Sequence, residues 1–296
     1  MIFVLLLGLA APVRGQEMTP EKILSFADHL FDQADYYRAI TEYERLIFFY
    51  PDHPLARTAK YQIALSYSKG DKFDQAIQRF RTLSDEYPNE ETGKEALFML
   101  GETYYRKKDY AQAIDVLERF QAIYPADARR DSAMIRIGWS YLRQGDWRQA
   151  SEEFQKVPAD SAVRPHAEGL AADVKAFPEI PNKSPYLAAG LSTVLPGAGQ
   201  LYVGRPVDAA VSFMLNGLFI WATVEAFQNN NNVTGAILLF FESGWYLGNI
   251  YNAASSAHKY NHRAEQDFLD RLSNQYSVSY IRDGQGNSVL AITMRF

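Results

Sequence analysis

Two kinds of residue in this chain have the spacing for metal or phosphate chemistry, namely its histidines and a pair of glycines. His258 and His262 stand four residues apart, so they would share one helix face as two zinc ligands do. A zinc site needs a third ligand, and the surrounding segment has the composition of a solvated helix. Gly197 and Gly199 follow no strand and lack the third glycine of a nucleotide-binding loop. We find no catalytic constellation, and we predict no enzyme activity, no metal and no cofactor.

Polar residues inside otherwise apolar segments are a second possible source of chemistry. If residues 207–254 fold into a hairpin about residue 230, Glu242 reaches the depth of Leu218, one turn from Asn216. An ionised carboxylate in hydrocarbon costs several kcal/mol. We therefore expect Glu242 to pair with Asn216, with Asn249 adding to the pair. The pair could be a proton-responsive or substrate-facing site, or it could supply hydrogen bonds between helices.

A repeat of 37 residues indicates which secondary-structure elements the chain forms and how they position its other residues. Three columns of similar residues recur with this step: Ala39, Ala76, Ala113 and Ala150; Tyr36, Phe73, Tyr110 and Trp147; and Pro51, Pro88 and Pro125. A fixed period of 20 to 50 residues is typical of a stacked repeat array. Small residues in register with large ones indicate helices that cross closely.

This pattern resembles the tetratricopeptide repeat (TPR) family over residues 18 to 160. The resemblance implies an all-α fold, an α-solenoid of four helix pairs, and we expect a capping helix over residues 162 to 176. The usual TPR period is 34 residues, so we expect the three extra residues to lengthen the turn after each Tyr-Pro pair. Lengthened repeats of this kind resemble those of TPR proteins of the bacterial envelope.

The resemblance also implies a binding groove. In TPR proteins, four positions on the first helix of each pair face the inner groove. Carried onto this chain, the large apolar and aromatic members of that set are Leu24, Phe31, Tyr61, Leu65, Phe98, Tyr105, Ile135, Trp139 and Leu142. We expect them to bind an extended peptide or a helix of a protein partner. The alternative is that the rest of the chain covers this face, or that it is partly core.

Composition limits the possible partners and cross-links. The net charge is −5 and the pI is near 5.6, which argues against a nucleic-acid partner. The chain contains no cysteine, which excludes disulfides, thiolate metal sites and lipid attachment to a cysteine. Residues 2–11 form a short apolar run before small residues, so we interpret 1–15 as a secretory signal peptide, with a retained anchor as the alternative. Cleavage and export would place the repeats outside the cytoplasm.

The character of the chain changes after a predicted TPR domain at 18–177 and a proline-rich linker at 178–185. We predict a transmembrane module over 186–255, because 207–227 and 233–254 are each long and apolar enough to cross a bilayer. The preceding apolar segment, 186–203, is broken, and it carries a motif that resembles the TM2 family of membrane domains. The residues of that motif are Pro196, Gly197, Gly199, Gln200, Tyr202 and Gly204.

The sequence is consistent with either two or three membrane spans and does not assign a role to the tail. Three spans would collect Arg205 and the basic residues after 257 on one side, as the positive-inside rule favours for exported repeats. Two spans satisfy the same rule if the repeats are cytoplasmic. In the tail, 256–296, we predict a short amphipathic helix at 264–272 and a β-hairpin around 283–287.

Together these features predict a membrane-anchored TPR scaffold of the bacterial cell envelope. Its partners would be a protein or peptide in the groove and the lipid bilayer, and not nucleic acid. We expect the inner rather than the outer membrane, with the repeats in the periplasm. The alternative function is a component of envelope transport or membrane insertion, with a polar path through the membrane near Pro196–Gly199, Asn216 and Glu242.

Overall fold

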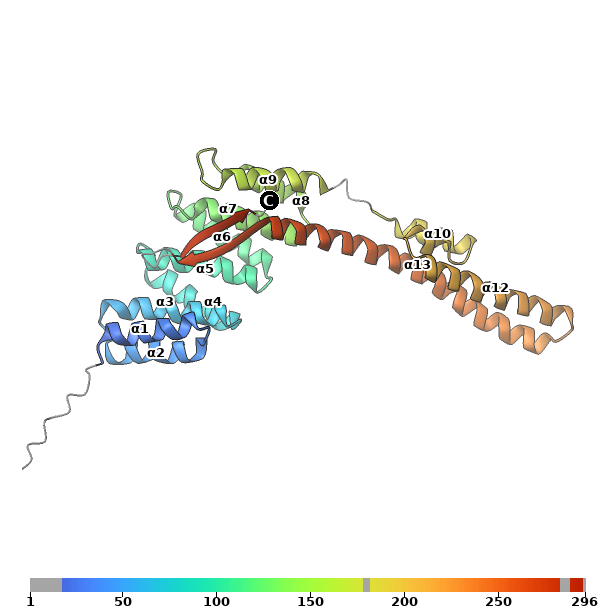
Figure 1. Cartoon of the computed structure of the whole chain (residues 1–296), viewed down its shortest axis with the longest axis horizontal. Coiled ribbons are helices and arrows are strands. Elements are labelled where there is room, and N and C mark those ends of the chain that lie inside the picture. The colour runs from blue at the N-terminus through green and yellow to red at the C-terminus, as the bar shows by residue number, and fades with distance from the viewer. Residues whose placement is uncertain (1–17, 178–181, 283–287, 295–296) are drawn as a thin grey trace, which may run out of the picture. The chain divides into compact units, whose positions relative to one another are not determined.

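Helices dominate the computed structural model, which describes residues 18–177, 182–282 and 288–294 (Figure 1). The predicted signal peptide and most of the predicted linker lie outside the described residues. The chain forms two compact units. The first runs to Ala171 and includes strand residues between Tyr280 and Leu290, and the second covers Ala172–Ser279 with the residues from Ala291 onward.

The first unit is built from four pairs of antiparallel helices, as the repeat pattern predicts. Each helix packs on the next one along the chain. The helices are α1 Pro20–Asp32, α2 Tyr36–Phe49, α3 Pro54–Lys69, α4 Phe73–Glu86, α5 Glu91–Arg106, α6 Tyr110–Ile123, α7 Arg130–Arg143 and α8 Trp147–Gln155. The first helix is capped by Thr19, whose side chain accepts a hydrogen bond from the Lys22 amide, and Pro20 occupies the first turn. Helix α9, Arg164–Lys175, follows at the place expected for the capping helix.

A second column of small residues with the same 37-residue step, Ala27, Ala64, Gly101 and Gly138, has a packing cause. A Cβ added to Gly138 would lie 2.4 Å from Cε1 of Phe154, and one added to Gly101 would lie 2.6 Å from Cδ2 of Leu117. Each glycine belongs to the first helix of a pair and its neighbour to the second helix. The backbones therefore approach so closely that only the smallest residues fit.

The turn inside each helix pair repeats a backbone feature that the sequence pattern does not show. Four residues, each 37 positions after the last, have positive φ: Ala34 at 60°, Asp71 at 58°, Lys108 at 67° and Gly145 at 80°. The amide of the next residue then closes the turn on a carbonyl five positions back, as in Asp109 N to Tyr104 O at 3.0 Å. Glycine adopts this conformation without strain, yet it occupies one of these four positions.

The second unit consists of α10 Pro185–Val194, α11 Ala198–Tyr202, α12 Pro206–Gln228 and α13 Asn232–Gln275. The segment 186–203 is not one helix, because its backbone turns at Leu195–Gly197 between α10 and α11. The separate helix predicted at 264–272 is wrong, since α13 continues unbroken from the apolar region to Gln275. Between Asn249 and Gln275 there is no glycine or proline to end it.

Two strands follow α13. They are β1, Tyr276–Arg282, and β2, Ser288–Met294, and they pair in a two-stranded sheet. The predicted connection at 283–287 lies outside the described residues, as does the chain end at Phe296.

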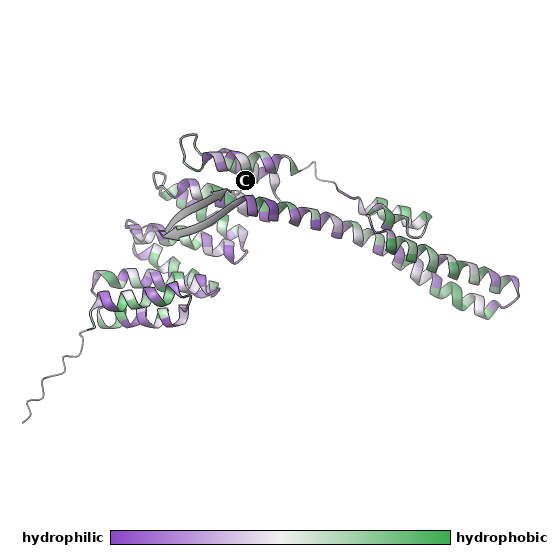
Figure 2. Ribbon diagram, in the orientation of Figure 1, coloured by the Kyte–Doolittle hydropathy of each residue, from purple (hydrophilic) through white to green (hydrophobic). Residues whose placement is uncertain are grey.

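Hydropathy is unevenly distributed along the second unit. Figure 2 shows α12 and the adjoining part of α13 as mostly hydrophobic, and the part of α13 nearer Gln275 as hydrophilic. By length and composition, α12 is the one helix of the described chain that could cross a membrane, and 17% of its most apolar window is buried. The predicted span at 233–254 forms the first half of α13 and falls short of the same measure. A single such helix also occurs in cores of soluble proteins, so spanning remains a prediction.

Candidate partner-binding groove and polar networks

The predicted groove residues lie on the first helices of the pairs, α1, α3, α5 and α7, but most of them are not free surface. Leu24, Phe31 and Tyr105 are half-buried. The other six are buried: Tyr61, Leu65, Phe98, Ile135, Trp139 and Leu142. The expectation of nine accessible apolar contacts therefore needs correction.

Ring packing within the helix pairs explains part of this burial. The Tyr61 ring meets the Phe80 ring edge-on at 5.8 Å between centroids, and the Phe98 ring meets Phe120 in the same way at 5.4 Å. In both cases a residue of the first helix packs on the second helix of its own pair. These two aromatic side chains, on α3 and α5, are core residues, and residue spacing along a helix could not distinguish a core stripe from a groove stripe.

In the middle helices, residues on every face are buried over more than two turns. All residues from 132 to 140 in α7 and from 96 to 104 in α5 are buried. A helix at an open groove would leave one face to solvent, so the inner face of the middle repeats is covered in this structure. The same compact unit includes strand residues from Tyr280 to Leu290. This arrangement agrees with the alternative that the chain itself covers the groove.

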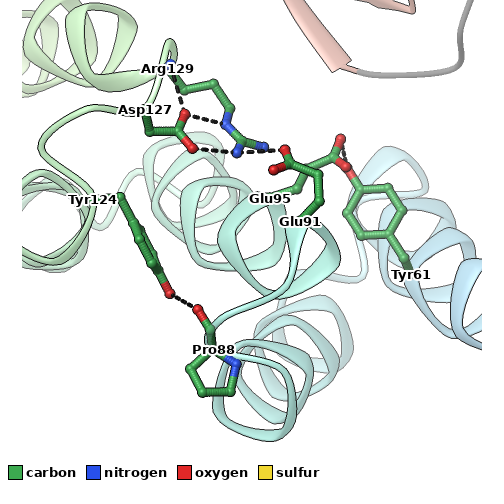
Figure 3. Close-up of polar contacts among 7 residues, drawn as sticks. All are labelled: Tyr61, Pro88, Glu91, Glu95, Tyr124, Asp127 and Arg129. Carbon is green, nitrogen blue, oxygen red and sulfur yellow. Dashed lines mark hydrogen bonds and ion pairs between the residues drawn. The ribbon is translucent and has the colours of Figure 1, made fainter.

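Polar contacts join successive repeats near this face (Figure 3). The Tyr61 hydroxyl of α3 donates to Oε1 of Glu95 in α5 at 2.8 Å. One turn earlier on α5, Glu91 pairs with Nη2 of Arg129 at 2.7 Å, and Arg129 also binds Asp127 at 2.7 Å. These contacts tie three repeats together and place three carboxylates and one guanidinium in one cluster.

The charge state of this cluster follows from its hydrogen bonds. Desolvation raises the pKa of Asp127, but hydrogen bonds from the Arg129 side chain and backbone outweigh it, so the net pKa lies below its usual value. Asp127 and Arg129 are therefore both charged at neutral pH. Glu91 remains largely exposed, with 64% of its side-chain surface accessible. The cluster thus has an exposed carboxylate, Glu91, at its edge.

A second ion pair lies deeper, between α5 and α7. Nε of Arg136 lies 2.6 Å from Oε1 of Glu102, and both residues are buried. The guanidinium also stacks over the Tyr105 ring at 4.4 Å from the centroid. The sequence analysis did not single out this pair. The one sequence feature that marks the pair is Arg136, a charged residue at the repeat position that holds Gln62 and Met99 in the two preceding repeats.

The TM2-like motif forms the connection between α10 and α12. Gly197 has a φ of 90°, and a Cβ there would lie 2.2 Å from the Ala209 carbonyl oxygen. Gly199 is equally crowded, with the Ala188 carbonyl oxygen 2.0 Å from its added Cβ. Gly204 also has positive φ, at 79°. The Tyr202 hydroxyl accepts a hydrogen bond from the Ser184 amide at 3.2 Å.

Gln200 is the polar centre of this connection and is fully buried. Its amide donates to Oδ1 of Asn249 at 2.7 Å, and its oxygen accepts from the Ser192 hydroxyl at 3.0 Å. The same hydroxyl accepts from the Gly199 amide at 3.0 Å. The network therefore holds α10, α11 and α13 together and satisfies backbone that the broken helix leaves free.

The predicted pair of Asn216 with Glu242 is not formed. Nδ2 of Asn216 donates to the Ser212 carbonyl of its own helix at 2.6 Å. Both carboxylate oxygens of Glu242 are buried without a hydrogen-bond partner. Asn249 binds Gln200 rather than either of them. Asn216 uses its Nδ2 within its own helix and leaves its Oδ1 without a hydrogen-bond partner, which an estimate of depth along the hairpin could not reveal.

Comparison with known proteins agrees with the repeat geometry. Family models described as tetratricopeptide repeat match residues 61–128 and 132–160. This chain contains tetratricopeptide repeats. A search of curated proteins found no match. TPR arrays are typical of non-catalytic scaffolds that bind proteins, so the matches suggest a protein-interaction role.

Several solved structures resemble this TPR chain. A tetratricopeptide repeat protein from Parabacteroides merdae is 14% identical, with 86% of this chain and 99% of that chain covered and a TM-score of 0.43. MamA from Desulfovibrio magneticus RS-1 is 19% identical, with 51% of this chain and 77% of that chain covered and a TM-score of 0.40. At these identities and TM-scores, the two structures say nothing about the partner of this chain.

Proposed function

We propose that this protein is a membrane-anchored scaffold of the bacterial cell envelope that binds a protein or peptide partner through its TPR repeats. The main support for membrane anchoring is the apolar surface of the second unit. Large apolar side chains are exposed throughout α10–α13 as far as Tyr251, among them Trp221 at 63%, Phe240 at 76% and Leu247 at 68%. A continuous apolar surface of this kind marks a membrane or partner contact.

The Gln200 network supports a bilayer as the covering medium. Irregular backbone at membrane depth is tolerated only where protein or a water-filled cavity satisfies its polar groups. Here Ser192, Gln200 and Asn249 satisfy the break between α10 and α11 from within the unit. The buried network therefore meets the condition that a bilayer would set for this break.

The lengths of the elements favour two membrane spans. Helix α10 has ten residues, which extend about 15 Å, half of a hydrocarbon core. Two spans, by α12 and the first half of α13, leave both flanking segments on one side. Arg205, at the start of the hairpin, donates to Ser256, near its end, at 2.8 Å. The repeats and the strand residues at 280–282 and 288–290 belong to one compact unit, so they must also share a side.

Two sequence signals differ on which side this is. The leader-like residues 1–15 favour export, whereas Arg205, Lys259 and Arg263 favour a cytoplasmic location under the positive-inside rule. We propose the periplasmic side, with the inner membrane as the anchor, because a leader peptide at 1–15 would direct export; with two spans this orientation places Arg205, Lys259 and Arg263 on the exported side, against the positive-inside rule. The opposite orientation would leave the scaffold role intact and place its partner in the cytoplasm.

Site-specific photo-crosslinking in living cells tests the binding role. A photoreactive phenylalanine analogue replaces Leu24 or Phe31, the half-buried groove positions of the first repeat. The matched control carries it at Phe48, which is 78% exposed on α2, the second helix of the same pair. We expect a defined adduct with another protein from the groove positions and none from Phe48.

Two results would contradict a partner in the groove. The first is a pattern in which the adducts join only residues of the same chain. The second is labelling of equal strength from Phe48, which would show that crosslinking does not depend on the groove face.

A further inference from the structure

The cover of the TPR groove face does not extend to the first repeat. The predicted groove residues that are fully buried all lie in α3, α5 and α7, whereas Leu24 and Phe31 of α1 are half-buried. Polar residues in register with them differ in the same way. Ser132 of α7 is 8% exposed, whereas Glu21, three repeats earlier at the equivalent place in α1, is exposed. The face is therefore covered along the second to fourth repeats and more open at the first.

This cover comes from outside the helix pairs. Each first helix packs on neighbouring second helices and, along its flanks, on other first helices, as α3 does on α2, α4, α1 and α5. Helix α9 lies on α8 instead, where the Ser151 hydroxyl donates to the Ala171 carbonyl at 3.3 Å. Strand residues at 280–282 and 288–290 belong to the same compact unit as the repeats. Among the described residues of that unit, these strands are left to cover the groove face.

The start of the hairpin is fixed at the end of the capping helix. Tyr276, the first residue of β1, is buried, and its hydroxyl donates to Oδ2 of Asp173 in α9 at 2.7 Å. Two turns earlier, the ring of Phe268 in α13 packs on the ring of Phe177, with 5.2 Å between centroids. A segment tethered so closely to its site is present there at an effective concentration of about 1 mM. A free partner must compete with that concentration.

We propose that the β1–β2 hairpin is an intramolecular ligand of the TPR groove and that a protein partner binds by displacing it. This inference rests on the proposed binding role of the repeats. The two strands contain a single charged residue, Arg282, among mostly apolar and small polar residues. A competitor for the same face should share this chemistry, as an extended and mainly apolar segment. Its first contact would be the more open first repeat, at Leu24 and Phe31.

The absence of native cysteine lets a single thiol report on the covered face. Ser132→Cys places the reporter at a groove position of α7. The matched control is Ser84→Cys, because Ser84 is equally buried, at 7% exposed, but lies in α4, the second helix of its pair. Both are made in the full chain in detergent, and the rate of modification by N-ethylmaleimide is measured. In the native background, we expect both thiols to react slowly.

Proline in β2 then weakens the hairpin without touching the repeats. Successive residues of an antiparallel pair alternate between bonded and non-bonded positions, so Val289→Pro and Leu290→Pro are tested separately and one of them removes a ladder hydrogen bond. That substitution should raise the modification rate of Ser132→Cys at least about tenfold, because the rate follows the open population. The rate of Ser84→Cys should not change.

Two labelling results would overturn the inference. If neither proline changes the rate at Ser132→Cys, the hairpin is not the cover. If a proline accelerates both reporters equally, the hairpin supports the whole repeat fold and does not act as a ligand of one face. In either case the scaffold role stands, provided that the native chain gives a partner adduct from Phe31.

The adduct itself tests the competition. The photoreactive analogue at Phe31 should give about threefold or more partner adduct in cells when the opening proline is present, since a larger fraction of the chain is then competent to bind. Faster labelling of Ser132→Cys with no gain in adduct would mean that the hairpin covers the groove without competing, and the inference would be wrong. If neither the native nor the opened chain gives an adduct, the proposed binding role fails and this inference fails with it.

Discussion

At the scale of single residues, buried charged and polar side chains contribute more to the contacts between elements than the exposed row of aromatic residues that the sequence suggests. Phe98 and Trp139 fit a groove pattern and a core pattern equally well, and the structure buries both. Glu102 and Arg136, by contrast, are costly to bury unless paired. Their contact connects two repeats. Spacing alone could place these residues on helices but could not say which neighbour each one meets.

His166 predicts a pH dependence of repeat stability. It is 2% exposed in α9, and burial lowers the pKa of its imidazole from 6.5 to about 4. The unfolded chain therefore takes up this proton before the folded chain does as the pH falls. The stability that depends on neutral His166 is complete above pH 6.5 and is lost as the pH falls from 6.5 towards 4. At pH 5 the loss is about 2 kcal/mol.

Urea unfolding of the full chain in detergent, followed by circular dichroism at pH 7.5 and pH 5, measures this effect. His166→Leu removes the titrating group, so the variant should lose about 2 kcal/mol less than the native chain over this interval. Equal losses in the two chains would mean that His166 does not titrate as its burial requires.

At the scale of elements, the repeat period was readable from sequence because packing fixes the residue types in its columns. The small residues where helices cross and the proline after each second helix are such columns. The turn inside each pair was not readable, because its positive φ falls on Ala34, Asp71, Lys108 and Gly145, which share no side-chain chemistry. The continuity of α13 could have been predicted from the absence of glycine and proline between Asn249 and Gln275, but the change of polarity after residue 255 was taken as a helix end.

These turns allow a prediction with an internal control. Lys108 and Gly145 occupy equivalent positions, both exposed and both with positive φ. Lys108→Gly should stabilise the repeats by about 0.5–1 kcal/mol, because glycine adopts this conformation without strain. Gly145→Ala should destabilise them by about 1 kcal/mol through backbone strain alone, since no atom lies within 4 Å of its Cβ position.

Chemical denaturation of the two variants gives both values in the same experiment. Effects of opposite sign support a left-handed residue in each turn. The same sign for both substitutions would mean that the turns do not share this backbone geometry.

At the scale of the whole molecule, the two units expose surfaces of different character. The first unit shows few exposed apolar side chains and carries the repeats that the family models match. The second unit exposes apolar side chains on α10, α12 and the first half of α13. Composition along the chain predicted this division, and helix lengths then favoured two spans. The partner could not be predicted from the sequence, and the leader-like residues and the basic residues of the second unit gave opposite predictions for the side of the membrane.

The most direct measurement is the partition of the full chain after cell lysis and carbonate washing. An integral anchor predicts that the chain stays with the membranes and is released by detergent. Replacing Phe213, Leu218 and Trp221 of α12, all more than half exposed, with lysine should move it to the soluble fraction. The account would be contradicted if the native chain were soluble and monodisperse without detergent.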